Sequence, residues 1–242
     1  MSGARCVLFG GTGAVGGAVL EQLAARGARV AFTYHAREDL ARRRAEEQGA
    51  TAVQVNLADV SSVERAVDAA VASLGGVDAF VQCAGVAARE TPESSLHPTI
   101  PEIGEPAWDR MLDVLVKGSF FAARSVTSRM ARGNVVLMGS VDGVKSARSP
   151  VHYATAHGAI SAMARAMAKE LGVRQIRVNV VAPGPLEAGQ ASVTPPELKR
   201  EFLRHSGLRR LGRVAEIASV VTWLALDNTY VTGRTVCLDG GL

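Results

Sequence analysis

The sequence is poor in aromatic residues and has no long apolar run. Phe, Trp and Tyr make up 5% of the 242 residues, which leaves little surface on which nucleic-acid bases could stack. The net charge of +4 arises from Lys and Arg residues scattered among 23 acidic ones, so we expect no nucleic acid as a partner. A membrane span takes about 20 consecutive apolar residues, and neither such a stretch nor a cleavable signal pattern is present. We therefore expect a cytoplasmic protein with no membrane partner.

Cysteine is also scarce. Cys6, Cys83 and Cys237 are odd in number, far apart in the chain, and each set in an apolar segment. A disulfide framework needs paired cysteines, and a structural zinc site needs closely spaced Cys and His ligands. The sequence therefore predicts buried thiols and no metal.

Short Val-rich apolar runs alternate along the chain with longer Ala-rich stretches of helical period. This alternation is typical of a parallel sheet with helices on both faces. The predicted strands are residues 6–9, 30–34, 51–56, 79–83, 134–139, 176–182 and 235–238, and the predicted helices are residues 14–26, 38–48, 61–74, 106–130, 153–171 and 215–225. We expect an α/β protein: a single doubly wound Rossmann domain over residues 1–242, with a seven-stranded, mainly parallel sheet.

Two proline-containing segments interrupt this alternation, residues 86–105 and residues 183–211. Both follow predicted strands, so both emerge at the carboxyl edge of the sheet, where open α/β folds bind ligands. The second segment is long for a connection. We interpret residues 183–211 as a mobile substrate lid with short helical pieces.

Gly11-Thr12-Gly13-Ala14-Val15-Gly16 has the spacing G-x-G-x-x-G between a predicted strand and a predicted helix. Glycine lets the backbone turn tightly and approach a pyrophosphate, and the free N–H groups at the start of the helix stabilise its charge. We therefore expect Gly11, Thr12, Gly13, Val15 and Gly16 to bind a dinucleotide. The alternative is a glycine-rich turn without a ligand.

The end of the second predicted strand indicates which dinucleotide is bound. An acid there would bond the adenosine ribose 2′-hydroxyl and repel a 2′-phosphate, but Thr33-Tyr34-His35-Ala36-Arg37 contains none before Glu38. We therefore favour NADP(H) over NAD(H), with Arg37 and His35 facing the phosphate. In the alternative, Arg37 simply begins a solvated helix. The run Arg42-Arg43-Arg44 is interpreted as a solvated face of that helix, because acidic residues follow it.

Motifs along nearly the whole chain resemble the short-chain dehydrogenase/reductase family. Residues 78–85 resemble the family's strand ending in Asn-Asn-Ala-Gly, Ser140 stands thirteen residues before Tyr153, and Pro183-Gly184 follows the sixth predicted strand. Residues 208–217 and 231–241 resemble the family's closing signatures. Among family members the chain is most similar to the 3-oxoacyl-acyl carrier protein reductases.

The resemblance implies a reduction in which Tyr153 donates a proton to a carbonyl oxygen that also accepts a hydrogen bond from Ser140. Tyrosine has a pKa near 10 and needs a neighbouring cation to exchange protons at neutral pH. The family supplies a lysine four residues after the tyrosine, where this chain has His157. The family also carries an asparagine in its proton relay, where this chain has Leu115. Two of the four expected catalytic positions are therefore changed.

His157 has two interpretations. Its imidazole can hydrogen-bond a cofactor ribose hydroxyl, and with a reference pKa near 6.5 it is mostly neutral at pH 7; we would then expect a slow reductase that is favoured by acid. In the other interpretation His157 merely packs against Leu115 in an abandoned relay. Lys145, in the loop between Ser140 and Tyr153, is a candidate substitute cation.

The remaining cofactor contacts are implied by the resemblance alone. The glycine spacing is similar to that of the family's extended and atypical branches, with Phe9 where a threonine usually begins the motif. Further contacts are expected beside adenine at Asn56 and Leu57, after the sixth strand at Pro183 and Gly184, and at Ala84 and Gly85, which allow the cofactor to approach closely.

Three functions follow from these residues. The first is an NADP-dependent reductase of a ketone or 3-oxoacyl carbonyl, free or on a carrier protein, for which Arg132 and Arg174 near the predicted substrate mouth are candidate contacts. The second is a catalytically impaired partner subunit of an active paralogue. Family members form homotetramers through helices that correspond to residues 106–130 and 153–171, so we expect a homotetramer, a homodimer or such a mixed oligomer. The third is a dehydratase, isomerase or cyclase with Tyr153 as its acid.

Overall fold

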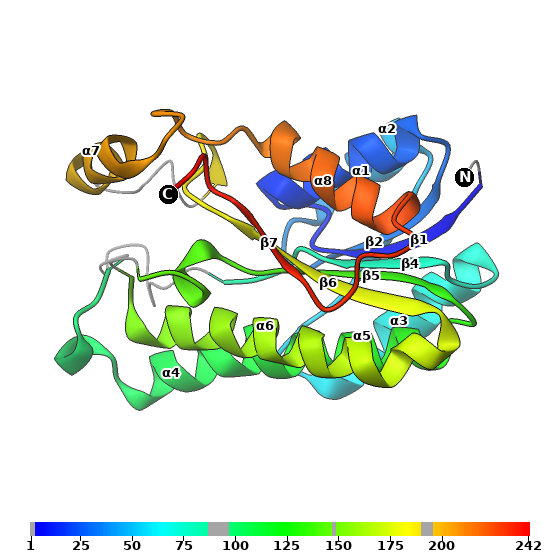
Figure 1. The fold of residues 1–242 in the computed structure, drawn as a ribbon. Coiled ribbons are helices and arrows are strands. Elements are labelled where there is room, and N and C mark those ends of the chain that lie inside the picture. Colours follow the sequence, from blue (N-terminus) through cyan, green and yellow to red (C-terminus); the bar gives the residue numbers. More distant parts are fainter. Residues whose placement is uncertain (1–2, 87–96, 147–148, 190–195) are drawn as a thin grey trace.

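A seven-stranded parallel sheet forms the centre of the molecule (Figure 1). The computed structural model describes residues 3–86, 97–146, 149–189 and 196–242. The strands are β1 (Arg5–Phe9), β2 (Arg29–Tyr34), β3 (Thr51–Gln54), β4 (Ala79–Gln82), β5 (Gly133–Met138), β6 (Ile176–Pro183) and β7 (Thr235–Leu238). Their order is β3-β2-β1-β4-β5-β6-β7, and every neighbouring pair is parallel. The predicted fold class is confirmed, and each strand lies close to its expected bounds.

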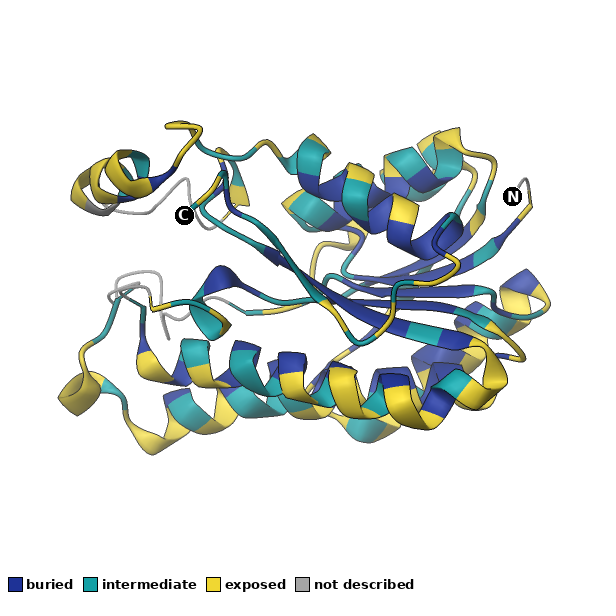
Figure 2. Cartoon of the chain, viewed as in Figure 1, coloured by how far each residue is buried: buried dark blue, intermediate teal, exposed yellow. Residues whose placement is uncertain are grey.

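Helices cover both faces of this sheet. On one face lie α1 (Ala14–Ala25), α2 (Glu38–Gln48) and α8 (Val214–Leu226); on the other lie α3 (Val60–Leu74), α5 (Gly118–Ser128) and α6 (Val151–Leu171) (Figure 1). Along β1, Val7 and Phe9 belong to one buried cluster, and Cys6 and Leu8 to the other. The central strands are therefore buried on both sides, as Figure 2 shows, and this explains their continuous apolar sequences.

One expected helix is divided into three parts. Residues 106–130 were predicted as a single helix, but α4 (Glu105–Met111) and α5 are joined by a π-helix, η2 (Leu112–Lys117). A π-helical turn inside a helix frequently marks a functional site, because it disrupts the regular backbone hydrogen bonding. Among the described residues, no helix is long and apolar enough to cross a membrane.

The connections carry the shorter helices. They are the 3₁₀ turns η1 (Ile100–Glu102), η3 (Val141–Gly143) and η4 (Gly172–Arg174), and helix α7 (Pro196–His205) inside the segment predicted as a lid. Residues 190–195 of that segment lie outside the described residues. All three cysteines are free; Cys6 is buried as expected, whereas Cys83 and Cys237 are only partly buried.

The strand order reverses around β1. From β1 the chain proceeds to β2 and β3 on one side, and then crosses to β4 on the other. Open α/β sheets bind ligands at the carboxyl ends of the strands on either side of such a reversal. The loops after β1 and β4 therefore define where the functional site should lie.

Candidate active site

The loop after β1 packs so tightly that glycine is required in it. Gly10 has a φ of +88°, and a Cβ there would lie 2.6 Å from the backbone nitrogen of Ala84 at the end of β4. A Cβ on Gly16 would lie 2.1 Å from the Gly10 carbonyl oxygen. Gly13 occupies the N-cap position of α1, so the first N–H groups of the helix have no capping side chain. The predicted motif began at Gly11 and missed Gly10, whose contact with Ala84 holds the loop at the reversal.

Arg44 on α2 reaches across to this loop. Its Nη1 atom donates hydrogen bonds to the carbonyl oxygens of Gly11, at 2.5 Å, and Gly13, at 3.2 Å. The interpretation of the arginine run as a solvated face is right for Arg42 and Arg43, which are exposed, and wrong for Arg44. Arg44 follows the buried Ala41 by three residues and therefore shares its inward side of the helix. That spacing was the signal in the sequence.

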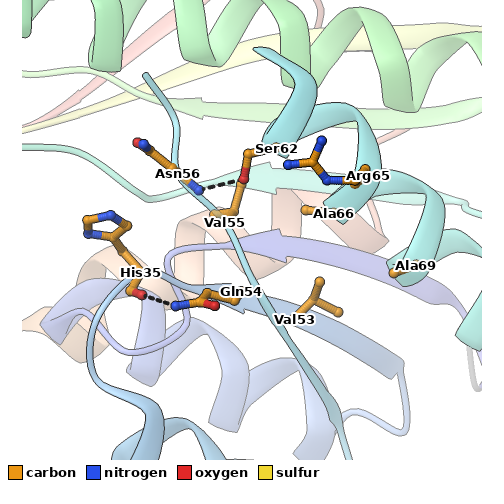
Figure 3. Close-up of a pocket in the computed structure, with 9 residues that line it drawn as sticks. All are labelled: His35, Val53, Gln54, Val55, Asn56, Ser62, Arg65, Ala66 and Ala69. Carbon is orange, nitrogen blue, oxygen red and sulfur yellow. Dashed lines mark hydrogen bonds between the residues drawn. The ribbon is translucent and has the colours of Figure 1, made fainter. Parts of the chain in front are cut away.

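A pocket of about 450 Å³ lies at the ends of β2 and β3 (Figure 3). It brings together two of the predicted cofactor residues, His35 and Asn56, with Ser62 and Arg65 from α3. The Asn56 backbone N–H donates to the Ser62 hydroxyl at 3.0 Å, and Gln54 donates to the His35 carbonyl oxygen at 3.0 Å.

Two other predicted cofactor residues lie outside this lining. Arg37 is exposed at the N-cap position of α2, and Leu57 is buried where Gly118 packs closely against its carbonyl oxygen. Glu38 is the first acid after β2, and Arg42 donates to its carboxylate at 2.6 Å. Both side chains are exposed, so Arg42 offsets the charge of that carboxylate only in part.

The predicted reaction residues meet at the carboxyl edge of the sheet. Ser140 follows β5, and Tyr153 lies in the first turn of α6. Burial and the charge of Asp142 raise the pKa of Tyr153 to about 12, and a hydrogen bond with Ser140 opposes this rise. The Ser140 hydroxyl itself donates to the Asp142 carboxylate, at 3.0 Å. The structure therefore places Ser140 and Tyr153 together, and adds Asp142, which the sequence analysis missed although it stands two residues after Ser140.

His157 is buried beside Tyr153. The two rings meet edge to face, with their centroids 4.4 Å apart. Burial lowers the pKa of His157 to about 4, and its Nδ1 atom finds no hydrogen-bond partner among the residues that the structure describes. The imidazole is therefore neutral at pH 7 and supplies no positive charge to the tyrosine.

Leu115 lies in the π-helix η2 and is 4% exposed. A Cβ built on Gly85 would lie 2.9 Å from its Cδ2 atom, so Leu115 packs directly against the loop after β4. η2 and α6 also pack together. Leu115 thus lies in the π-helix, at the position where the family carries the asparagine of its proton relay, but its apolar side chain can neither donate nor accept a hydrogen bond.

Three basic residues do not have the roles that the sequence suggested for them. Lys145 pairs with Asp239 at 2.6 Å and donates to the Leu242 carbonyl oxygen, so its charge is already neutralised and it is not the substitute cation. Arg132 and Arg174 directly precede β5 and β6. They therefore lie at the amino edge of the sheet, opposite the site, and their assignment to the substrate mouth is wrong. Arg174 instead donates to the backbone carbonyl oxygens of Thr127, in the last turn of α5, and of Met130, just after α5.

The comparisons with known proteins agree with this geometry. A family model described as enoyl-(acyl carrier protein) reductase matches residues 12–242. The chain is 30% identical over 245 residues to the 3-oxoacyl-[acyl-carrier-protein] reductase FabG of Staphylococcus epidermidis strain ATCC 35984, covering 98% of this chain and 97% of the relative. It is 32% identical over 247 residues to the cyclic-di-GMP-binding biofilm dispersal mediator protein of Escherichia coli K12, covering 99% and 97%.

Solved structures give the same result. A blue fluorescent protein from a metagenomic library, crystallised in complex with NADPH, superposes with a TM-score of 0.91 at 30% identity, covering 99% of this chain and 98% of that one. The glycine loop at the strand reversal, the Ser140 and Tyr153 pair and the match along almost the whole length lead to one assignment. The chain belongs to the short-chain dehydrogenase/reductase family of NAD(P)-linked oxidoreductases.

Proposed function

We propose that this protein is an NADP(H)-dependent reductase of ketones, including 3-oxoacyl groups, free or carried on an acyl carrier protein. The meeting of Ser140 and Tyr153 at the carboxyl edge carries this proposal, because a hydroxyl pair there can bind and protonate a carbonyl oxygen. The similarity to 3-oxoacyl-[acyl-carrier-protein] reductases supports the substrate class. A cytoplasmic location fits the same assignment.

The residues of the nucleotide site fit a bound dinucleotide phosphate. The glycines after β1 leave room that a Cβ would fill, and the start of α1 offers uncapped N–H groups. NADP(H) is favoured over NAD(H) because Arg42 pairs with the carboxylate of Glu38, while His35 lines the pocket at the ends of β2 and β3 and Arg37 is the exposed N-cap residue of α2. The NADPH in the complex of the blue fluorescent protein supports the same choice. Ala84, Gly85, Pro183 and Gly184 follow β4 and end β6 and would border the same ligand.

When bound, the reduced nicotinamide supplies the hydride that reaches the carbonyl carbon. Tyr153 holds the proton that the carbonyl oxygen receives, and Ser140 hydrogen-bonds that oxygen. His157 packs against the Tyr153 ring as a neutral imidazole and keeps it oriented. Because no cation among the residues that the structure describes favours the phenolate, we expect turnover to be slower than in relatives that carry the lysine.

We further propose that residues 1–242 act as one domain, in which the segment 183–211, including α7, covers the substrate. The long helices α5 and α6 would form the contacts of a homotetramer or homodimer. Phe120 on α5 is 42% exposed and its ring packs against that of Phe121, which gives this face an apolar surface. Native mass spectrometry of the full chain tests the assembly.

The test of the main proposal is calorimetric titration with NADPH and NADH, followed by NADPH oxidation with ethyl acetoacetate as a probe ketone. We expect tighter binding of NADPH and measurable oxidation, which Tyr153→Phe should lower at least 100-fold. The exposed Tyr230 gives a matched control, because Tyr230→Phe should leave the rate unchanged. No binding of either nucleotide would reject the reductase.

A catalytically impaired subunit is the second candidate. The buried neutral His157 and the pKa of Tyr153 near 12 favour it, because such a site resists forming the phenolate that proton donation leaves. Such a subunit would bind NADPH without reducing the probe ketone, and would co-purify with a paralogue carrying the intact Tyr-x-x-x-Lys motif. A dehydratase, isomerase or cyclase would instead convert its substrate without NADPH oxidation.

A further inference from the structure

Asp142 is an acid inside the site to which the proposed function assigns no role. It lies in η3, the 3₁₀ turn directly after Ser140. The Ser140 hydroxyl donates to Asp142 Oδ2 at 3.0 Å and accepts a hydrogen bond from the Asp142 N–H at 3.3 Å. The carboxyl group is therefore held at a fixed position against the hydroxyl that would bind the substrate oxygen.

Asp142 is partly buried, and few charged groups surround it among the residues that the structure describes. η3 packs against α6 so closely that a Cβ on Gly143 would lie 2.5 Å from the His157 carbonyl carbon. From α6 the titratable groups on this side are Tyr153 and the neutral His157, and the buried His152 lies in the same turn as Tyr153. His97 faces Asp142 from the segment before η1, and Ser149 hydrogen-bonds it. Lys145, the cation among the described residues of its own segment, is paired with Asp239.

Burial raises the pKa of Asp142, while hydrogen bonds from Ser140 and Ser149 and the charge of His97 oppose this rise. The carboxyl group therefore retains its proton to a higher pH than an exposed aspartate does. When ionised, Asp142 in turn raises the pKa of Tyr153. The two groups are thus coupled, with Ser140 between them.

We propose that Asp142 is a positioning residue that acts through Ser140: it holds the serine hydroxyl and returns a proton through it to Tyr153 after each reduction. This inference rests on the proposed reductase function. It gives the chain a route for protons on the serine side of the site, in place of the lysine and asparagine that His157 and Leu115 have replaced.

Each proton transfer breaks one O–H bond and forms another. Tyr153 loses its hydroxyl proton to the substrate oxygen as the carbon accepts the hydride of the nicotinamide cofactor. For this transfer Asp142 carries a proton and donates it to the Ser140 oxygen, the reverse of the hydrogen bond that the ionised carboxylate accepts from Ser140. The Ser140 O–H bond then breaks as its proton moves to the Tyr153 oxygen, and the Asp142 O–H bond breaks as its proton moves to the Ser140 oxygen. A hydronium ion from solvent then protonates the Asp142 carboxylate and is left as water. Each turnover takes up one proton from solvent.

The first test needs no turnover. Aspartate carboxyl groups are labelled with ¹³C and titrated by NMR, and the Asp142 signal is identified by its absence in Asp142→Asn. We expect Asp142 to titrate above exposed aspartates, and Ser140→Ala to raise its pKa further, because the variant removes a hydrogen bond that lowers it. Titration like an exposed aspartate, unaffected by Ser140→Ala, would overturn the coupling and the proposal with it.

The second test is the pH profile of kcat with saturating NADPH and ethyl acetoacetate. The rate should fall as pH rises through the pKa of Asp142. Asp142→Asn should remove that limb and lower kcat about 10- to 100-fold with little change in KM, while Asp142→Glu should restore part of the rate. The control is Asp109→Asn, at an exposed position on α4. Equal NADPH affinity and melting temperature would show that the variant is folded.

These measurements distinguish a failure of the proton route through Asp142 from a failure of the reductase function. If the wild type reduces the ketone and Asp142→Asn reduces it equally fast with the same pH profile, Asp142 has no role in proton return although the reductase stands. If the wild type binds NADPH but reduces no ketone, the reductase itself fails and the proton route falls with it. If Asp142→Asn loses the fall of kcat at high pH and the control Asp109→Asn keeps it, the proposal is supported.

Discussion

Replacing His157 with lysine should lower the pKa of Tyr153 and speed ketone reduction. In the protein as it stands, burial holds His157 neutral, with a pKa of about 4, beside a tyrosine whose pKa is about 12. Proton donation leaves Tyr153 as a phenolate. A positive charge one helical turn away would stabilise that phenolate, which the imidazole does not.

The size of the effect follows from the spacing of the two side chains. The ring centroids are 4.4 Å apart, so an ammonium group at position 157 would lie on the order of 5 Å from the tyrosine. At an effective dielectric constant of about 20, two unit charges at that distance interact by about 3 kcal/mol. This equals about two pKa units, so the pKa of Tyr153 should fall from about 12 to about 10. If half of this stabilisation is expressed in the transition state, kcat should rise about tenfold.

The assay compares kcat for ethyl acetoacetate, at saturating NADPH, in His157→Lys and in Thr155→Lys. Thr155 is exposed on the same helix, so the second variant adds an equal charge that faces solvent. Alkaline absorbance titration of phenolate, with Tyr153→Phe to identify the signal, measures the pKa directly. If His157→Lys folds but is no faster than Thr155→Lys, and the Tyr153 pKa does not move, the missing cation is not what limits this site.

Other predictions concern the cofactor loop and the sheet. Arg44→Ala should weaken NADPH binding about tenfold, because it releases the glycine loop. Arg37→Ala should weaken the binding of NADPH far more than that of NADH. If calorimetry shows that Arg37→Ala weakens the binding of both nucleotides equally, the 2′-phosphate assignment is contradicted. Gly16→Ala should abolish binding, because its Cβ would lie 2.1 Å from a carbonyl oxygen, and retained affinity would refute the tight loop. A hydrogen bond from Arg5 lowers the pKa of Asp78, so the pair stabilises the fold above pH about 4 and this contribution is lost as the pH falls. Asp78→Asn should therefore lower the free energy of unfolding in urea by about 1 kcal/mol at pH 7. A larger loss at pH 3 than at pH 7 would contradict this.

The fold was predictable because strands and helices carry different apolar periods. β1 and β5 are buried on both faces and read as continuous apolar runs, while α1 places Val19 and Leu23 on one face. The division of residues 106–130 was not predictable. A π-helical turn has i→i+5 hydrogen bonds, but six residues are too few to show a period of their own, so Leu112–Lys117 reads as ordinary helix.

The site was predictable only where a residue and its neighbours lie in one motif. Ser140 and Tyr153 could be named from their spacing, whereas the role of Arg44 depends on where α2 crosses the glycine loop. Lys145 is the opposite case, because its place in the sequence suggested a role in the site that a distant residue excludes. It stands between the two reaction residues in the sequence, yet Asp239, 94 positions away, neutralises it.

The two changed positions of the site should also depend on each other. Leu115 is 4% exposed and packs against Gly85, so Leu115→Asn alone buries an amide without a partner and should lower the free energy of unfolding by about 2 kcal/mol without raising kcat. In the His157→Lys background we expect the amide to gain a charged neighbour, because η2, which carries position 115, packs against α6, which carries position 157.

A double-mutant cycle measures this dependence. The stability lost through Leu115→Asn should shrink by about 1 kcal/mol when Lys is present at position 157, and the double variant should be faster than His157→Lys alone. Urea unfolding and kcat at pH 7 give both values. Equal effects of Leu115→Asn in the two backgrounds would mean that the two positions do not interact, and that the replaced residues do not belong to one lost proton route.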